Sequence, residues 1–296
     1  MLALRTRLRE MDWFADRGLQ EPNMAALLDL VALGTVADVV PLDRNNRILI
    51  DEGLKRIRAG QTCPGILALL EVANRKVRQL SASDLGFSLG PRLNAAGRLD
   101  DMSTGIECLL AKEQGSAYEL ALQLDAMNQD RRQIEADMRE QAFAYLEELT
   151  LEEDGIPPAL FVYDPRWHQG VVGILASRIK DRFNRPVIAF AEASRDESPA
   201  EKGIELKGSA RSIKGFHVRD ALDAVACHHP GLITRFGGHA MAAGLSLDKS
   251  RLTEFTKAFE DEARRMLSEE QLTATLLSDG EIQSTWLSME IAEQLE

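Results

Sequence analysis

Residues 159–191 read ALFVYDPRWHQGVVGILASRIKDRFNRPVIAFA, and the patterns in this stretch decide the fold of the second half of the chain. Two short apolar runs, residues 159–163 and 186–191, have the composition and flanking residues of buried strands. Between them, residues 171–183 carry apolar side chains at helical spacing. A strand, a helix and a strand in this order predict a parallel strand pair joined by a right-handed crossover.

Further elements are expected after this unit. The patterns predict strands at residues 207–213 and 244–247, and helices at residues 218–227 and 251–267. The second half is therefore expected to be a mixed sheet flanked by helices, in the α/β class.

One long amphipathic helix is expected at residues 116–149, before an acidic, proline-bearing linker at residues 151–158. A helix of this length spans roughly 50 Å and can connect two domains. Arg131 and Arg132 interrupt its apolar stripe. A solvated helix face is the favoured interpretation, and the alternative is that one arginine turns toward nucleic acid. The stripe consists of Leu120, Leu124, Met127, Ile134, Met138, Ala142, Tyr145 and Leu149.

The first 110 residues show helical patterns and no clear alternating strand. A region of this kind is expected to be the helical remainder of a larger domain. Helices are expected at residues 23–33 (ending near Gly34), 46–58, 64–73, 84–89 and 104–110, with the sequence GPRLN at residues 90–94 forming a turn.

Composition limits the class of protein. A chain of 296 residues is long enough for two domains, and it has no apolar run long enough to span a membrane. Three widely spaced cysteines fit a reducing cytoplasm and exclude a cysteine zinc site of the usual spacing. The net charge of −12 argues against a protein that coats nucleic acid, but residues 160–251 hold 14 Lys and Arg against 10 Asp and Glu, a net charge of +4. This asymmetry favours a basic site in an acidic protein.

Two histidines lie among glycines. Residues 237–244 read GGHAMAAG, where the backbone around Gly238 and His239 is open to an anion. His168 follows the first strand of the crossover unit and precedes its helix, with Gly170 and Gly173 nearby. Both patterns favour phosphate contacts, because ligands bind at the ends of strands and at helix N-termini. The alternatives are a tight turn into a buried helix for the glycine run and a structural Trp-His pair for His168.

Three arginines and one aspartate are further candidates. Arg92 and Arg98 flank a turn of small residues, and Arg211 lies in the similar sequence GSARS, so each can contact phosphate. Asp38 lies among apolar residues, which predicts a buried carboxylate that is either paired or bound to metal.

Four motifs resemble one family in the same order. Residues 34–42 (GTVADVVPL), 90–98 (GPRLNAAGR), 166–178 (RWHQGVVGILASR) and 208–212 (GSARS) closely resemble the RecJ family of single-strand-specific DNA exonucleases, in the DHH phosphoesterase superfamily. The resemblance covers roughly residues 27–247. It implies a DNA groove between two domains, and it implies that Asp38 is one ligand of a two-manganese centre. The residues that it places at the groove are Arg92, Asn94, Arg98, Ser209, Arg211 and His239.

The resemblance also implies a domain organisation. Residues 1–115 would be the C-terminal part of a DHH catalytic domain, 116–150 a connector helix, 151–267 a DHH-associated nucleic-acid-binding domain and 268–296 the start of a linker toward an OB-fold. The other metal ligands of the family, including its Asp-His-His triplet, are absent from the sequence, and one carboxylate cannot hold two metals. The chain is therefore expected to be an inactive internal fragment.

The resemblance implies a parent protein that degrades single-stranded DNA from 5′ to 3′ with Mn²⁺ or Mg²⁺, in repair and recombination. Single-strand-binding protein and a helicase are its implied partners, in the cytoplasm and away from membranes. Two alternatives stay open: a phosphodiesterase that acts on short oligonucleotides, and a single-stranded nucleic-acid-binding module without catalysis.

Overall fold

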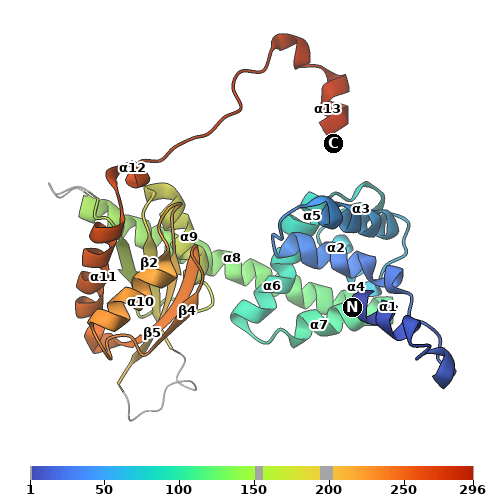
Figure 1. Ribbon diagram of the computed structural model, residues 1–296, viewed down its shortest axis with the longest axis horizontal. Coiled ribbons are helices and arrows are strands. Elements are labelled where there is room, and N and C mark those ends of the chain that lie inside the picture. Colours follow the sequence, from blue (N-terminus) through green and yellow to red (C-terminus); the bar gives the residue numbers. More distant parts are fainter. Residues whose placement is uncertain (1, 151–155, 194–202, 296) are drawn as a thin grey trace. The chain divides into compact units, whose positions relative to one another are not determined.

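The computed structural model describes residues 2–150, 156–193 and 203–295, and its contacts divide the chain into two compact units, Met1–Gln141 and Ala142–Glu296. The division falls within the long helix α8 (Gln114–Thr150), which confirms the helix expected at residues 116–149 (Figure 1). Residues 151–155 of the expected linker lie outside the described residues.

The first unit is helical throughout the part of the chain that the structure describes. The helices expected at residues 46–58, 64–73 and 104–110 are confirmed, and local caps define their starts. Asp43 accepts a hydrogen bond from the backbone N–H of Asn46 at 2.8 Å, and Pro64 occupies the first turn of its helix. The α-helices of this unit before α8 are α1 (Leu2–Glu10), α2 (Leu28–Ala37), α3 (Arg44–Arg58), α4 (Pro64–Val72), α5 (Ala82–Asp84), α6 (Gly90–Leu99) and α7 (Ser103–Leu110).

Two expectations for the secondary structure of this unit, the end of α2 and the turn at GPRLN, are wrong. Helix α2 passes through Gly34 and continues to Ala37, because a glycine ends a helix only when it adopts a left-handed conformation, which Gly34 does not. The sequence GPRLN is not a turn, since it begins α6 directly after a π-helical turn at Leu85–Leu89. Pro91 lies in the first turn of α6, next to the π-helical turn.

The buried stripe of α8 differs from the predicted one. Arg131 belongs to this stripe and is buried, whereas Arg132 is exposed, so the expectation that both arginines face solvent is wrong for Arg131. The sequence pattern counted apolar residues only, and the real stripe contains three polar ones. Its members are Ala117, Ala121, Leu124, Asn128, Arg131, Glu135, Met138, Ala142 and Leu146.

The second unit contains a five-stranded mixed sheet in the order β1-β2-β3-β5-β4. β1 and β2 are parallel and joined by α9, as predicted, and the other pairs are antiparallel. Strand β4 was missed, because its sequence, RFGG, has no apolar alternation. The elements are β1 (Leu160–Tyr163), α9 (Val172–Phe183), β2 (Val187–Glu192), β3 (Glu205–Arg211), α10 (Val218–His228), β4 (Arg235–Gly238), β5 (Ala242–Asp248), α11 (Leu252–Met266), α12 (Glu269–Leu272) and α13 (Met289–Leu295).

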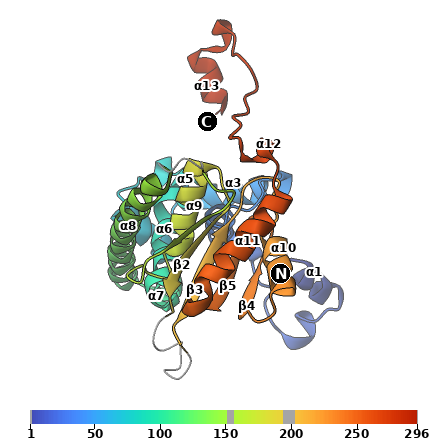
Figure 2. The ribbon, with the colours of Figure 1, turned by 90° about the vertical axis from the view of Figure 1, so that its left-hand side faces the viewer.

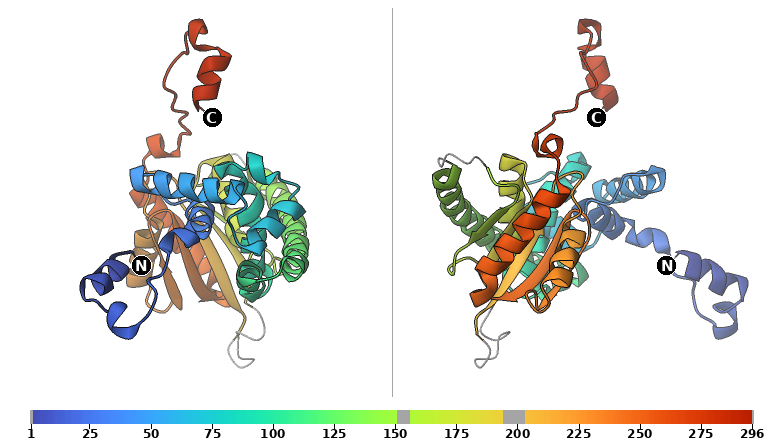
Figure 3. Two further views of the ribbon diagram at one scale, coloured as in Figure 1. Left: turned by 90° about the vertical axis from the view of Figure 1, so that its right-hand side faces the viewer. Right: turned by 60° about the vertical axis from the view of Figure 1, so that its left-hand side comes forward.

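The two faces of this sheet carry different helices. Helices α10 and α11 cover one face, as Figures 2 and 3 show, and α9 lies on the other. The first face encloses the core of the unit, where the rings of Phe190 and Phe255 meet edge-to-face at 5.8 Å. Helix α9 packs on β2 and β3. On the same face of the sheet, the part formed by β5 and β4 is therefore left to carry polar groups.

None of the described helices has both the length and the apolar character needed to cross a membrane.

Candidate nucleic-acid interface

Arg211 and Ser209 lie together on one face of β3. Arg211 Nη1 donates hydrogen bonds to Ser209 Oγ at 3.0 Å and to the carbonyl oxygen of Ala210 at 2.8 Å. Residues two apart on a strand share a face, and these two lie on the face that α9 covers. The fixed guanidinium and the adjacent hydroxyl are suited to hydrogen bonding with a phosphate group.

Gly173, in the first turn of α9, lies against this pair. A β-carbon at position 173 would stand 2.7 Å from Arg211 Nη2 and 3.0 Å from Ser209 Oγ, so any larger residue would displace the arginine. The first turn of a helix carries partial positive charge, which adds to the charge of the guanidinium. Both features favour an anion at this place.

His168 lies in the loop that leads into α9. Its Nδ1 accepts a hydrogen bond from the backbone N–H of Gly170 at 3.1 Å, so the neutral ring carries its proton on Nε2 and presents a donor. The neighbouring Trp167 is buried and anchors the loop. Trp167 therefore has a structural position, while the half-buried His168 presents the Nε2 edge of its ring as a donor.

The glycine run at residues 237–244 forms a β-hairpin, and the alternative of a tight turn into a buried helix is wrong. Gly238 has φ 147°, and a β-carbon there would lie 2.4 Å from the carbonyl oxygen of Ala242. The exposed His239 closes the hairpin: its N–H donates to Ala242 O at 2.8 Å, and its Nδ1 accepts from Met241 N–H at 3.2 Å. Its Nε2 therefore faces outward as a donor.

The hairpin lies at the end of the sheet that Arg211 occupies. Ser212 N–H donates to Met241 O at 2.9 Å, and Arg211 is paired with Ala242 across β3 and β5. The structure thus brings together Ser209, Arg211 and the hairpin that carries Gly238 and His239, as well as the first turn of the helix that follows His168.

The sequence reading missed two cations on the same face. Lys207 is paired with Ser246, which in turn is paired with Arg235 on the edge strand β4. Lys207 and Arg235 line a shallow cavity of about 380 Å³, whose floor includes Gly237 and Gly244. The alternation of Lys207, Ser209 and Arg211 in the sequence KGSAR could have shown that the three share a face.

In the first unit, Asp38 and Asn94 line one cavity of about 440 Å³, between α2, α6 and α7. Asp38 is exposed and follows the last residue of α2, so the expectation that this carboxylate is buried is wrong. The helix continues past Gly34 and brings Asp38 to its C-terminal end, where partial negative charge adds to that of the carboxylate. This position attracts a cation.

The described residues supply only part of a metal centre. Across residues 2–150, 156–193 and 203–295, no group of three His, Cys, Asp or Glu side chains could hold a metal ion. Asp38 is one suitable oxygen ligand, and two metals need several. A two-metal centre therefore does not fit the residues that the structure describes. Asp101 lies just before α7 and accepts a hydrogen bond from Ser103 N–H at 3.0 Å.

Arg92 and Arg98 project from helix α6, and the expectation that they lie on a loop is wrong. Arg92 is engaged within the unit: its Nη2 lies 2.8 Å from Asp125 Oδ1 and its Nη1 donates to Ser88 O at 2.6 Å. Arg98 is exposed at the surface. Burial of part of its side chain and the nearby charge of Arg131 lower the pKa of Arg98.

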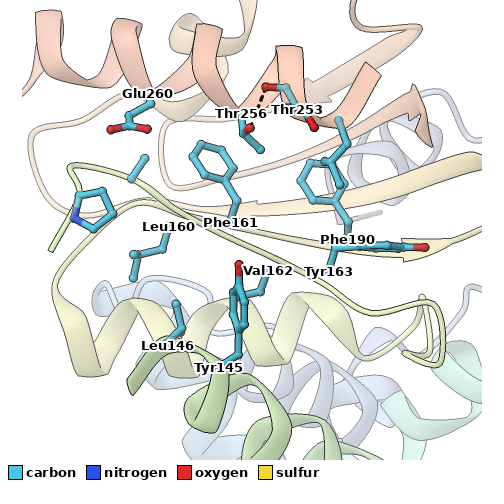
Figure 4. A pocket seen from close by; sticks show the side chains of 13 residues that line it. Tyr145, Leu146, Leu160, Phe161, Val162, Tyr163, Phe190, Thr253, Thr256 and Glu260 are labelled. Carbon is cyan, nitrogen blue, oxygen red and sulfur yellow. Dashed lines mark hydrogen bonds between the residues drawn. The ribbon is translucent and has the colours of Figure 1, made fainter. Parts of the chain in front are cut away.

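Another cavity of the second unit, of about 420 Å³, lies beside the edge strand β1 (Figure 4). Aromatic and aliphatic side chains such as Tyr145 and Phe161 line it. Among the described lining residues, Glu260 is the one that carries a charge. An anionic ligand therefore does not suit this cavity.

Residues 157–265 match the DHHA1 domain. Over 295 residues, the chain is 61% identical to the single-stranded-DNA-specific exonuclease RecJ of Dickeya dadantii and 55% identical to that of Escherichia coli, covering 100% of this chain and 50% of each relative. A crystal structure of Thermus thermophilus RecJ in complex with Mg²⁺ matches with a TM-score of 0.68 at 32% identity, over 85% of this chain and 36% of that one. A structure of the same protein with Mn²⁺ matches equally, over 34% of its chain.

The residues that match the DHHA1 domain, 157–265, lie within the second unit and contain its mixed sheet. The chain as a whole belongs to the RecJ family and spans about half the length of the relatives that it matches.

Proposed function

We propose that this chain forms part of a single-stranded-DNA-specific 5′–3′ exonuclease of DNA repair and recombination, and that its own contribution is to hold the DNA strand. The observation that carries this proposal is the contact between Gly173 and the guanidinium of Arg211, with Ser209 hydrogen-bonded beside it. This group, with the outward donors of His168 and His239, offers a set of phosphate contacts on one unit.

Four residues, two on each unit, would form the interface with single-stranded DNA. Arg92 and Arg98 belong to the first unit, and Arg211 and His239 belong to the second. Their convergence on one groove stays a prediction, as do the roles of Asn94, Ser209 and Gly238 and the domain limits at residues 115, 150 and 267. Arg92 would serve mainly by holding α6 against α8, because Asp125 already occupies its guanidinium.

The full-length protein would bind the divalent metal ions that the reaction needs. Two RecJ structures similar to this chain are complexes with Mg²⁺ and Mn²⁺. The place of Asp38 at a helix C-terminus supports a role as one ligand. Since the described residues do not complete a two-metal site, we propose that the 296-residue chain alone binds DNA without hydrolysing it. Cytoplasmic location and partnership with single-strand-binding protein and a helicase belong to the same proposal.

The test uses 5′-labelled single strands and the 296-residue chain with Mn²⁺. We expect binding that weakens steeply with salt, and no released mononucleotide. Turnover that Asp38→Ala abolishes would show a complete site and contradict the proposal. Preference for dinucleotides over longer strands would instead support a phosphodiesterase acting on short oligonucleotides. A full-length protein that binds but never cleaves would support a non-catalytic module, which the incomplete set of metal ligands favours as the second candidate.

A further inference from the structure

A row of polar side chains crosses the sheet of the second unit, next to the row that contains Ser209. In this row, Ser246 of β5 is paired with Lys207 of β3 on one side and with Arg235 of the edge strand β4 on the other. Residues directly opposite each other on antiparallel strands point to the same face of a sheet, as do residues two apart on one strand. The row therefore lies on the face that carries Arg211.

Ser246 is the buried member of this row. Its exposed fraction is 3%, and its hydroxyl forms no hydrogen bond with any residue that the structure describes. Ser246 lines the shallow cavity of about 380 Å³ together with Lys207 and Arg235. A buried hydroxyl without a partner is unfavourable, so it is expected to be satisfied by something that the chain does not supply. An acceptor oxygen of a ligand in the cavity would do this.

The charges around the cavity favour an anionic ligand. The exposed guanidinium of Arg235 forms no ion pair within residues 2–150, 156–193 and 203–295. Lys207 Nζ lies 3.4 Å from Glu205 Oε2, which offsets part of its charge. The next row along the sheet pairs Glu205 with Asp248, so the positive strip ends there. An anion is therefore attracted to the Arg235 side of Ser246 rather than further along the sheet.

Two glycines separate this row from that of Arg211. Gly244 is paired with Ser209 on one side and with Gly237 on the other. Neither glycine has a left-handed φ. A β-carbon at position 237 would meet no described atom within 4 Å, and one at position 244 would lie 4.0 Å from the carbonyl oxygen of Gly208. Neither backbone conformation nor packing within the unit requires glycine here, although glycine weakens a strand. Close approach of a ligand explains both.

We propose that Arg235 and Ser246 bind a second phosphate of the single strand, and that the nucleotide between the two phosphates lies over the paired glycines. The pair repeats the combination of Arg211 and Ser209, a guanidinium beside a hydroxyl. Four residues of β3 separate the two rows, roughly 13 Å at the rise of a strand, so the rows can bind different phosphates. The identity of the ligand as DNA rests on the proposed function, whereas an anion position at Arg235 does not.

Salt dependence of single-strand binding tests whether two phosphates are held. Arg235→Gln should make the slope of log affinity against log salt shallower by about 0.7, the value for one phosphate contact with a single strand. Arg211→Gln/Arg235→Gln should lower it by about 1.4, twice that value. A double variant with the slope of Arg211→Gln alone would show that both arginines contact one phosphate and would overturn the second position. Arg219→Gln is the matched control, because exposed Arg219 lies on α10, which covers the other face, and its slope should equal that of the wild-type chain.

Two further variants separate ligand binding from a structural role. Ser246→Ala removes a hydroxyl that has no hydrogen bond within the described chain, so the melting temperature should not fall. Gly244→Ala adds a methyl group where the structure leaves space, and it should raise the melting temperature. We expect both variants to bind a single strand several-fold more weakly. Unchanged affinity in both would overturn the inference, since neither the hydroxyl nor the glycine surface would then face the ligand.

Inorganic phosphate distinguishes failure of this inference from failure of the proposed function. At constant ionic strength, phosphate should raise the melting temperature of Arg211→Gln more than that of Arg211→Gln/Arg235→Gln. If Arg235→Gln has the affinity and slope of the wild-type chain, the inference is overturned and the proposed function is intact. A wild-type chain that binds no single strand would overturn the proposed function. In that case a difference in phosphate stabilisation would still support the Arg235 position, and equal stabilisation would exclude it.

Discussion

Gly173 of α9 and Arg211 of β3 are in direct contact, and a β-carbon at position 173 would lie 2.7 Å from Arg211 Nη2. The two residues are 38 positions apart in sequence, so this contact depends on how α9 lies across the sheet. The glycine therefore sets the position of the guanidinium, which in turn is held by Ser209.

Gly173→Ala should move the guanidinium of Arg211 and reduce single-strand affinity about tenfold, the effect of losing one charge-assisted hydrogen bond. Adding it to Arg211→Gln should cause little further loss, because both changes remove the same contact. Gly115→Ala is the control, since a β-carbon there meets no atom within 4 Å. Fully additive losses would show that Gly173 acts independently of Arg211.

His239→Asn should separate the fold of the hairpin from its function. Asparagine can replace the acceptor that His239 Nδ1 offers to Met241 N–H, but it does not reach as far as Nε2. We expect an unchanged melting temperature and a several-fold loss of affinity. His217→Asn is the control, because His217 accepts a hydrogen bond from Asp220 N–H as the N-cap of α10, a position that asparagine fills well. Equal affinities for the two variants would exclude His239 from the interface.

Asp29→Ala tests the hydrogen bonds that join α2 to α4. The buried carboxylate accepts from Thr62 Oγ1 at 2.7 Å and from Cys63 N–H at 3.2 Å. Its loss leaves donors without partners, which should lower the free energy of unfolding by about 1–3 kcal/mol in a denaturant titration. Asp51→Ala, at an exposed ion pair, should cost less than about 1 kcal/mol. A similar cost for both would mean that Asp29 is not structurally important.

The cysteines should differ in reactivity. Burial raises the pKa of Cys108 to about 11 and also raises that of Cys63, while Cys227 is exposed. Alkylation at pH 8, followed by mass spectrometry, should modify Cys227 first. Because the Cys108 thiol ionises more readily in the unfolded chain, its contribution to stability is complete below about pH 9 and is lost as the pH rises toward 11. Alkylation of Cys108 before Cys227 in the folded protein would contradict this order.

The strand–helix–strand unit could be predicted because its patterns are local. Each buried strand is a short apolar run, and α9 has helical periodicity between them. Strand β4 could not be found in this way, since Arg235, Gly237 and Gly238 pair with β5 through backbone hydrogen bonds and contribute little apolar surface. The glycines at residues 237–244 left a tight turn into a buried helix open as an alternative, whereas the chain forms a hairpin there.

Tertiary contacts explain the remaining differences between the structure expected from the sequence and the observed one. Helix α6 forms through Pro91 and Gly97 because it packs into the helical unit, and Arg92 bonds to α8. The buried face of α8 was assigned by counting apolar side chains, so Asn128, Arg131 and Glu135 could not be recognised as buried from the sequence. Arg235 was missed because only strand register places it on the face of Arg211, whereas Lys207 could have been found from its alternation with Arg211 in the sequence KGSAR.

The salt dependence of single-strand binding, compared between the wild-type chain and Arg211→Gln, tests the central claim most directly. Gly173 leaves space for the guanidinium of Arg211. If that guanidinium binds a phosphate of the DNA, Arg211→Gln should bind single-stranded DNA more weakly than the wild-type chain at low salt. Its slope of log affinity against log salt should be shallower by about 0.7, the value for one phosphate contact with a single strand. Equal affinity and equal slope for the two proteins would contradict the account.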